Sequence, residues 1–339
     1  PEHRQTFFLL FYVAVAGAVL AKGPLGALLP ALVIGPYLLL TRRLALVKEM
    51  QLGWGALIFL VLTAPWYILM GLRNEGYFTY FLIEKSFGSF ASAESTHPAP
   101  VHFYIPVLLG ALLPWTGFLP AAIWRSVKGL RGEGREAYLY LILWVGVMFV
   151  FFSAATSKLA SYLLPLMPAA ALLIGRLWDE GLTVSRSSKP WILIMSHLPM
   201  VVLTLAGFVY GWLHPPLALE VKYGITMSQV LVVGLLIAIS PAIALALLWS
   251  RRTAWAFGTL VAMVATIVAV FATWMGPAMD PYRSTREVAL ELDRMLPPAE
   301  PMVFFWREKD SALFYTDRDG VVLPTWEVED YLASDEEVY

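Results

Sequence analysis

Long apolar windows recur along most of the chain, and they restrict its fold more than any other feature. Nine of them are long enough to cross about 30 Å of hydrocarbon as helices. Because 59% of the 339 residues are hydrophobic and 14% are charged, the composition is that of a polytopic membrane protein. The sequence predicts an all-α transmembrane domain over residues 1–279. Its windows are 6–21, 24–41, 53–72, 102–124, 137–154, 159–177, 191–213, 228–248 and 254–276.

The lysines and arginines of the connecting loops are divided unevenly between the two sides of this predicted domain. Loops rich in Lys and Arg stay on the cytoplasmic side of a membrane. We therefore expect the larger set of 13 to be cytoplasmic: Arg4, Arg42, Arg43, Lys48, Arg125, Lys128, Arg131, Arg135, Arg176, Arg186, Lys189, Arg251 and Arg252. The 5 outer residues would be Lys22, Arg73, Lys85, Lys158 and Lys222. An odd number of spans then places the C-terminal residues outside.

Residues 280–339 differ from the rest, since they hold 15 of the 25 acidic residues and only 6 basic ones. We expect a small extracytoplasmic α/β unit here. Its predicted helix begins with a capping box of Ser284 and Glu287, and its predicted strands are 302–306 and 321–323. Two strands and one helix make little core, so we expect this unit to be truncated. The apolar face of the helix would be Val288, Leu292 and Met295.

Two lysines stand in tight outer hairpins, directly beside predicted spans. Lys22 precedes Gly23 and Pro24, which open the next helix, and Lys158 lies between two apolar windows. An ammonium group at this depth suits a phosphate at the headgroup level, helped by exposed amides at the start of a helix. The alternative is that each lysine only extends its side chain to the interface.

The outer segment before residue 102 contains further ionisable groups on a helix predicted at about 76–92. Glu84 could bind a sugar hydroxyl or a cation, or act as a base; the alternative is a solvated ion pair with Lys85, worth less than about 1 kcal/mol. His97 and His102 have only Glu94 nearby as a further ligand, which favours a loop role over zinc. We expect no metal site in this chain.

Several short motifs resemble one family when they are taken together over residues 15–170. The bacterial GT-C glycosyltransferases show similar outer-helix and hairpin elements, and the lipid A aminoarabinose transferases and the dolichyl-phosphate-mannose-protein mannosyltransferase group are the most similar. The matching runs are Lys22-Gly23-Pro24, Glu84 to Phe90, His97 to Pro100, Tyr104 to Trp115, Phe151-Phe152-Ser153 and Ser157 to Pro165. Lys85, Ser89 and Ala160 depart from the family pattern.

The resemblance implies an integral-membrane transferase that moves a sugar from a polyprenyl-phosphate carrier to a lipid A-like lipid or a protein. It would act at the outer face of a bacterial inner membrane. By the same resemblance, Lys22 and Lys158 would bind the donor phosphate. Glu84, Lys85, Tyr104 and Tyr162 would line the donor cavity or contact the acceptor. No nucleotide motif is present, and we expect no nucleic acid partner.

The catalytic residues themselves are not identified in this chain. The only aspartate before Asp280 is Asp179, on the predicted cytoplasmic side. In the family, the catalytic acidic residues lie in a large first outer loop, which would precede Pro1. We therefore expect an internal fragment that is inactive by itself. If the enzyme uses a divalent metal, residues outside this chain would hold it.

Two alternatives from other classes stay open at this point. A flippase or transporter for the same polyprenyl carrier would also explain the cavity, the prolines and the interfacial lysines. Transporters tend to place ionisable groups in mid-helix and to show internal repeats, and neither is evident here. A structural membrane subunit that binds partners through its acidic tail would leave both lysine hairpins unexplained.

Overall fold

The computed structural model describes residues 2–79, 99–132, 134–214, 225–297, 302–305, 310–316 and 318–323. Within these ranges, seven helices are long and apolar enough to cross a membrane, and two shorter apolar helices accompany them, Leu25–Leu40 and Val101–Ala111. The predicted all-α polytopic class is confirmed, and the chain is an integral membrane protein. The total of nine spans stays a prediction.

Packing divides the chain into two compact units that interleave in sequence. The first unit is Pro1–Val202 with Ala244–Phe257, and the second is Leu203–Ile243 with Gly258–Tyr339. Helices α10 (Trp191–Leu213), α12 (Met227–Trp249) and α13 (Thr253–Val270) therefore contribute to both units. The predicted domain boundary at residue 280 stays a prediction.

In the first unit, α1 (Glu2–Lys22) packs against α2 (Leu25–Leu40) and α4 (Leu52–Arg73), and the short α3 (Leu46–Glu49) precedes α4. Gly26 permits the close crossing of α1 and α2, because a Cβ there would lie 2.4 Å from the carbonyl carbon of Ala18. Two tyrosine hydroxyls donate hydrogen bonds that tie α1 to the turn before α4 and to α4 itself. Tyr12 donates to the carbonyl of Met50 at 2.9 Å, and Tyr67 to that of Val19 at 3.0 Å.

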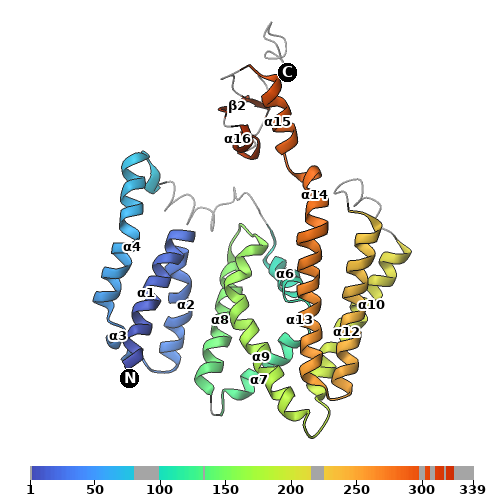
Figure 1. Ribbon diagram of the computed structural model, residues 1–339. Helices are drawn as coiled ribbons and strands as arrows, with labels where there is room; N and C mark the ends of the chain where they lie inside the picture. The colour runs from blue at the N-terminus through green and yellow to red at the C-terminus, as the bar shows by residue number, and fades with distance from the viewer. Residues whose placement is uncertain are drawn as a thin grey trace. The chain divides into compact units, whose positions relative to one another are not determined.

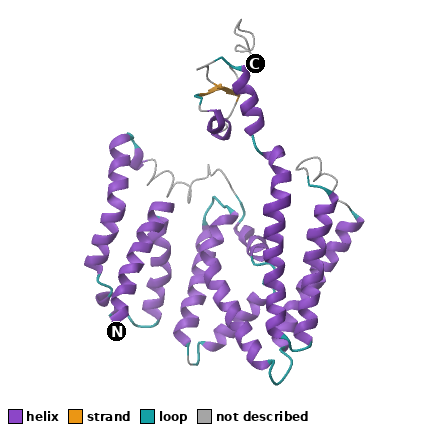
Figure 2. Cartoon of the chain, viewed as in Figure 1, coloured by secondary structure: helices purple, strands orange, loops and turns teal. Residues whose placement is uncertain are grey.

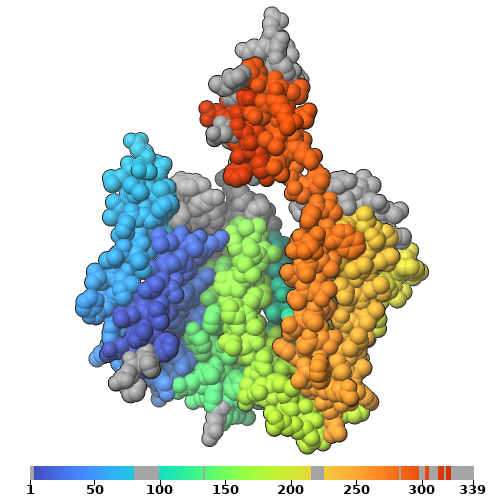
Figure 3. All heavy atoms as spheres, viewed as in Figure 1, coloured from blue at the N-terminus to red at the C-terminus, as the bar shows by residue number. Residues whose placement is uncertain are grey.

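Helix α8 (Arg135–Ala154) connects this group to the rest of the first unit. It packs against α2 on one side and against α9 (Met167–Val184) and α7 (Phe118–Gly129) on the other. Figure 3 shows the green helix α8 beside the blue part of the chain, where it packs against α2. Phe118 forms a buried aromatic centre, stacked on His197 at 5.5 Å and edge-on to Trp178 at 5.0 Å.

The predicted span over residues 102–124 is not one continuous helix. The structure has a 3-10 turn η2 (Val101–Phe103), helix α6 (Tyr104–Ala111), turns at 112–117 and then α7. Pro114 lacks the N–H that would continue the helix. Gly117 lies so close to α10 that a Cβ would be 2.2 Å from the carbonyl oxygen of Ser196. Gly117 therefore allows the turn before α7 to approach Ser196 of α10 closely.

Ion pairs collect in the loops that the charge count assigns to the cytoplasm. The N–O distances are 2.6 Å for Arg4–Glu49, 2.6 Å for Arg43–Glu136 and 2.7 Å for Arg125–Glu180. Because these groups are partly exposed, each pair contributes at most about 1 kcal/mol. Lysines there also lie over tryptophan rings, at 3.7 Å for Lys128 on Trp124 and 3.7 Å for Lys189 on Trp249. Aromatic and basic side chains together are typical of a membrane interface.

The second unit continues from α13 through a π-helical turn η4 (Phe271–Met275) into α14 (Gly276–Arg283) and α15 (Arg286–Met295). Two short parallel strands follow, β1 (Met302–Phe305) and β2 (Gly320–Leu323), with Met302 opposite Gly320. Helix α16 (Asp310–Thr316), which the sequence analysis missed, connects them. Parallel strands need such a crossover, and Figure 2 shows the strands in orange beside these helices.

Two details predicted for α15 are wrong. The residue before the helix is Thr285, which makes no side-chain capping bond, and Ser284 accepts a 3.2 Å hydrogen bond from the N–H of Arg286 instead. The buried face contains Ala289, 1% exposed, whereas Val288 is 66% exposed and Met295 57% exposed. Packing against α16 and β1 sets this face, because Ala289, Met302 and Ala312 form the local core.

Candidate functional site

Two tight hairpins lie at the same end of the first unit. They contain Lys22, Lys158 and Tyr162, three of the four predicted site residues that the structure describes, and the fourth, Tyr104, is the first residue of α6. The first hairpin joins α1 to α2, and the second joins α8 to the 3-10 helix η3 (Ala160–Leu166) that precedes α9. Figure 1 shows the ends of α1 and α8 at the top of this unit. Gly23, with φ at +71°, closes the first hairpin, because this backbone conformation favours glycine.

Lys22 and Tyr162 bring the two hairpins together. The ammonium nitrogen of Lys22 lies 5.0 Å from the centroid of the Tyr162 ring, a cation–π geometry. Lys22 is exposed, whereas Tyr162 is half-buried. The ring therefore supports a cation that remains accessible from outside the hairpin.

A chain of aromatic rings continues inward from Tyr162. Its ring centroid lies 5.7 Å from that of Phe152, which is in turn 6.5 Å from that of Tyr104. Tyr104 is completely buried, and its hydroxyl donates a 3.1 Å hydrogen bond to the carbonyl of Leu159. Tyr104 and Tyr162 were predicted from the sequence, whereas Phe152 belongs to a matching motif but was not predicted as the ring between them.

Lys158 lies in the same hairpin as Tyr162 but in a different environment. It is 4% exposed, and its ammonium donates hydrogen bonds to the carbonyls of Ala99, at 3.0 Å, and of Ala155. A buried charge is costly unless it is hydrogen-bonded, and these two carbonyls meet that need. Sequence reasoning missed Ala99, because a backbone acceptor leaves no signal in residue identity.

Glu84, Lys85 and the greater part of the predicted outer helix at 76–92 lie outside the described residues. The predicted positions of Glu84 and Lys85 near the site therefore stay predictions. Across the ranges that the structure describes, no three His, Asp or Glu side chains come close enough to hold a metal ion.

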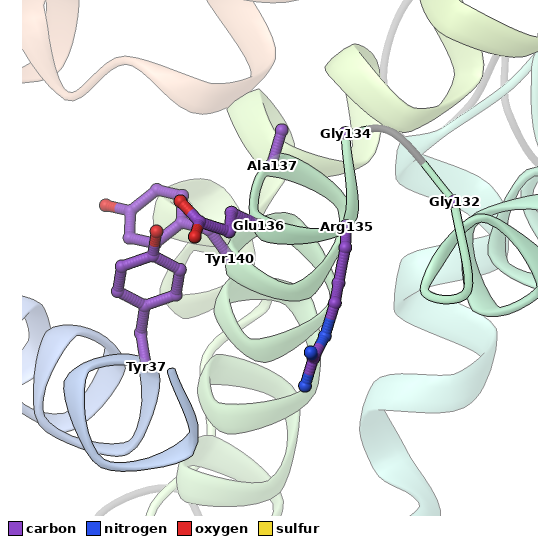
Figure 4. Close-up of a pocket in the computed structure, with 7 residues that line it drawn as sticks. All are labelled: Tyr37, Gly132, Gly134, Arg135, Glu136, Ala137 and Tyr140. Atoms are coloured by element: carbon purple, nitrogen blue, oxygen red, sulfur yellow. The ribbon is translucent and has the colours of Figure 1, made fainter. Parts of the chain in front are cut away.

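A separate open pocket of about 720 Å³ lies where α2 ends and α8 begins, beside the Arg-rich loops. Figure 4 shows Tyr37, Glu136 and Tyr140 pointing toward one another, while Arg135 runs away from them along α8. The two tyrosine rings meet edge-on at 5.4 Å, and Arg43 pairs with Glu136. None of the four predicted site residues that the structure describes lines this pocket.

Comparisons with known proteins identify relatives of this chain. No protein-family model matches. An undecaprenyl phosphate-alpha-4-amino-4-deoxy-L-arabinose arabinosyl transferase from Shewanella sediminis is 34% identical over 177 residues, which are 52% of this chain and 31% of that protein. The transferase of the same name from Pseudomonas aeruginosa UCBPP-PA14 is 32% identical over 231 residues, 67% of this chain and 40% of that protein.

The fold is similar to that of a solved member of this group. The crystal structure of ArnT from Cupriavidus metallidurans bound to undecaprenyl phosphate matches 94% of this chain and 57% of that chain, with a TM-score of 0.71 and 24% identity. The apo structure of the same protein matches with a TM-score of 0.73. The chain spans less than half the length of the curated relatives cited above. The resemblance to the lipid A aminoarabinose transferases within the GT-C group is thus confirmed.

Proposed function

We propose that this chain is part of an integral-membrane glycosyltransferase, which moves a sugar from a polyprenyl-phosphate carrier to a lipid A-like lipid or a protein. The names of the relatives support undecaprenyl phosphate as the carrier and 4-amino-4-deoxy-L-arabinose as the sugar. The observation that carries the proposal is the exposed Lys22 ammonium over Tyr162, at the end of the first unit away from the Arg-rich loops.

The proposed reaction breaks the bond between the sugar C1 and the phosphate oxygen. Negative charge then develops on the carrier phosphate, and a cation placed near its oxygens stabilises that charge. We assign this role to Lys22, because its ammonium is exposed and can make a charge-assisted contact with phosphate. A hydroxyl of the acceptor attacks C1, and a carboxylate accepts its proton. We expect that carboxylate, and any divalent metal, to lie outside this chain.

We also propose a bacterial inner membrane location with the Lys22 hairpin on its outer face. The uneven distribution of Lys and Arg supports this orientation. In the same orientation, the C-terminal residues with β1 and β2 are extracytoplasmic. The polyprenyl-phosphate-linked sugar and its lipid or protein acceptor would then meet at the outer surface of this membrane.

Transfer of a radiolabelled sugar from polyprenyl-phosphate donors tests the proposal in membranes that contain the complete protein. We expect Lys22→Gln to lower transfer by about tenfold or more, the effect of losing one charge-assisted contact of about 1.4 kcal/mol or more. Lys22→Arg should keep part of the activity, because it keeps the charge. Lys48→Gln is the matched control, since Lys48 is also exposed but lies in α3, before the predicted inner end of α4.

Two results would contradict the proposal. Full sugar transfer by Lys22→Gln would show that Lys22 does not bind the phosphate and only extends its side chain to the membrane interface. Movement of labelled carrier across vesicles without sugar transfer would identify a flippase instead.

A further inference from the structure

We infer that Lys158 is a positioning residue, which fastens residues 99–104 to the hairpin between α8 and η3, and that it does not bind the carrier phosphate. The two lysines near the site would then have separate tasks. The assignment of the phosphate to Lys22 rests on the proposed function, whereas the fastening role of Lys158 rests on the geometry alone.

The first support is where the ammonium group of Lys158 is directed. It bonds to the carbonyl of Ala99, which is 59 residues away in sequence, and to that of Ala155 at the end of α8. An ammonium has three N–H donors, so two of the three are already used. A move toward a phosphate in solvent would break both bonds and leave two carbonyls without this donor.

The second support is a reciprocal bond in the opposite direction. Lys158 donates from the hairpin to Ala99, and Tyr104 donates back to Leu159, the next residue of the hairpin. The two bonds hold both ends of the short segment that contains η2 (Val101–Phe103). Together they fix the start of α6 against the hairpin.

A series of aromatic contacts connects the segment 99–104 to the proposed phosphate site at Lys22. Tyr104 contacts Phe152, Phe152 contacts Tyr162, and the Tyr162 ring lies under the Lys22 ammonium. A loosened segment at 99–104 would shift these rings without removing Lys22. Loss of Lys158 should therefore affect the rate of transfer more than the binding of the carrier.

The test compares Lys158→Met with Lys22→Gln in the complete protein in lipid nanodiscs. Two quantities are measured: hydrogen exchange of residues 99–104, and binding of undecaprenyl phosphate. For Lys158→Met we expect exchange to rise about tenfold, while the Kd for undecaprenyl phosphate changes less than about threefold. In the transfer assay, kcat should fall and the KM for the donor should stay. Lys22→Gln should weaken undecaprenyl phosphate binding and leave exchange at 99–104 unchanged, and Lys48→Met is the control.

The inference is overturned if Lys158→Met weakens undecaprenyl phosphate binding as much as Lys22→Gln does while exchange at 99–104 is unchanged. If Lys158→Met does not fold, Tyr104→Phe serves instead, because it removes the reciprocal bond and keeps the ring. Unchanged exchange at 99–104 in Tyr104→Phe would then overturn the inference. Failure of the unaltered protein to bind undecaprenyl phosphate would refute the proposed function, and the exchange result would still decide the role of Lys158.

Discussion

At the scale of single residues, the chain shows how side chains of one type diverge in role. Lys22 is exposed over a ring, and Lys158 is buried on two carbonyls. Both could be selected from the sequence, because each stands in a tight hairpin between apolar windows. Their difference could not be predicted, since it depends on a backbone acceptor 59 residues away.

Arg318 gives a prediction at this scale. Its guanidinium donates to the Asp293 carboxylate at 2.5 Å and to the carbonyls of Pro297, at 2.8 Å, and Asp293, at 3.1 Å. Lysine has the charge but not the planar fork, so Arg318→Lys should destabilise this region by about 1–3 kcal/mol. Faster hydrogen exchange in β1 and β2 would report the loss. Arg294→Lys is the control on an exposed arginine of the same region, and equal exchange in both variants would contradict the account.

At the scale of elements, the apolar windows located the membrane helices well, because length and hydrophobicity are local properties. The break at 112–117 was missed, although Pro114 and Gly117 are visible in the sequence, since prolines are also common in unbroken membrane helices. The face of α15 was misjudged for another reason. Val288, Leu292 and Met295 fit a helical period as well as Ala289, Leu292 and Leu296 do, and only packing against α16 separates them.

The crossing of α1 and α2 can be tested with two glycines. A methyl group at Gly26 would meet the backbone of Ala18, whereas one at Gly35 in the same helix would meet nothing within 4 Å. Gly26→Ala should therefore cost about 1–3 kcal/mol. Gly35→Ala should be neutral or stabilise by up to about 1 kcal/mol. The two thermal unfolding midpoints measure this, and a lower midpoint for Gly35→Ala than for Gly26→Ala would refute the crossing.

The buried face of α15 gives a second test at this scale. Ala289→Leu would overpack the core around Met302 and should destabilise by about 1–3 kcal/mol. Val288→Ser changes an exposed side chain and should stay within about 0.5 kcal/mol. Hydrogen exchange of β1 and β2 distinguishes the two variants. Faster exchange in Val288→Ser than in Ala289→Leu would contradict this burial and favour the apolar face predicted from the sequence.

At the scale of the whole molecule, charge distribution was readable from the sequence and the division into units was not. Counting Lys and Arg needs only the order of the loops. In contrast, α10, α12 and α13 each contribute to both compact units, which depends on contacts far apart in sequence. The sequence therefore predicted the orientation in the membrane. It did not predict the boundaries between the two units, because these boundaries fall inside α10, α12 and α13.

Orientation can be measured directly, because this chain has 0 cysteines. A single cysteine at Arg73, the last residue of α4, should react in intact spheroplasts with a maleimide that cannot cross the membrane. One at Lys48, before α4, should react only after permeabilisation. The opposite pattern would invert the proposed topology and place the Lys22 hairpin on the cytoplasmic side.

An experimental structure of the complete protein with undecaprenyl phosphate bound would show directly which lysine contacts the carrier phosphate. We expect a phosphate oxygen within about 4 Å of the Lys22 ammonium nitrogen, the distance of an ion pair. Lys158 should keep its bond to the carbonyl of Ala99. A phosphate bound to Lys158, or bound away from both hairpins with Lys22 in solvent, would contradict the account.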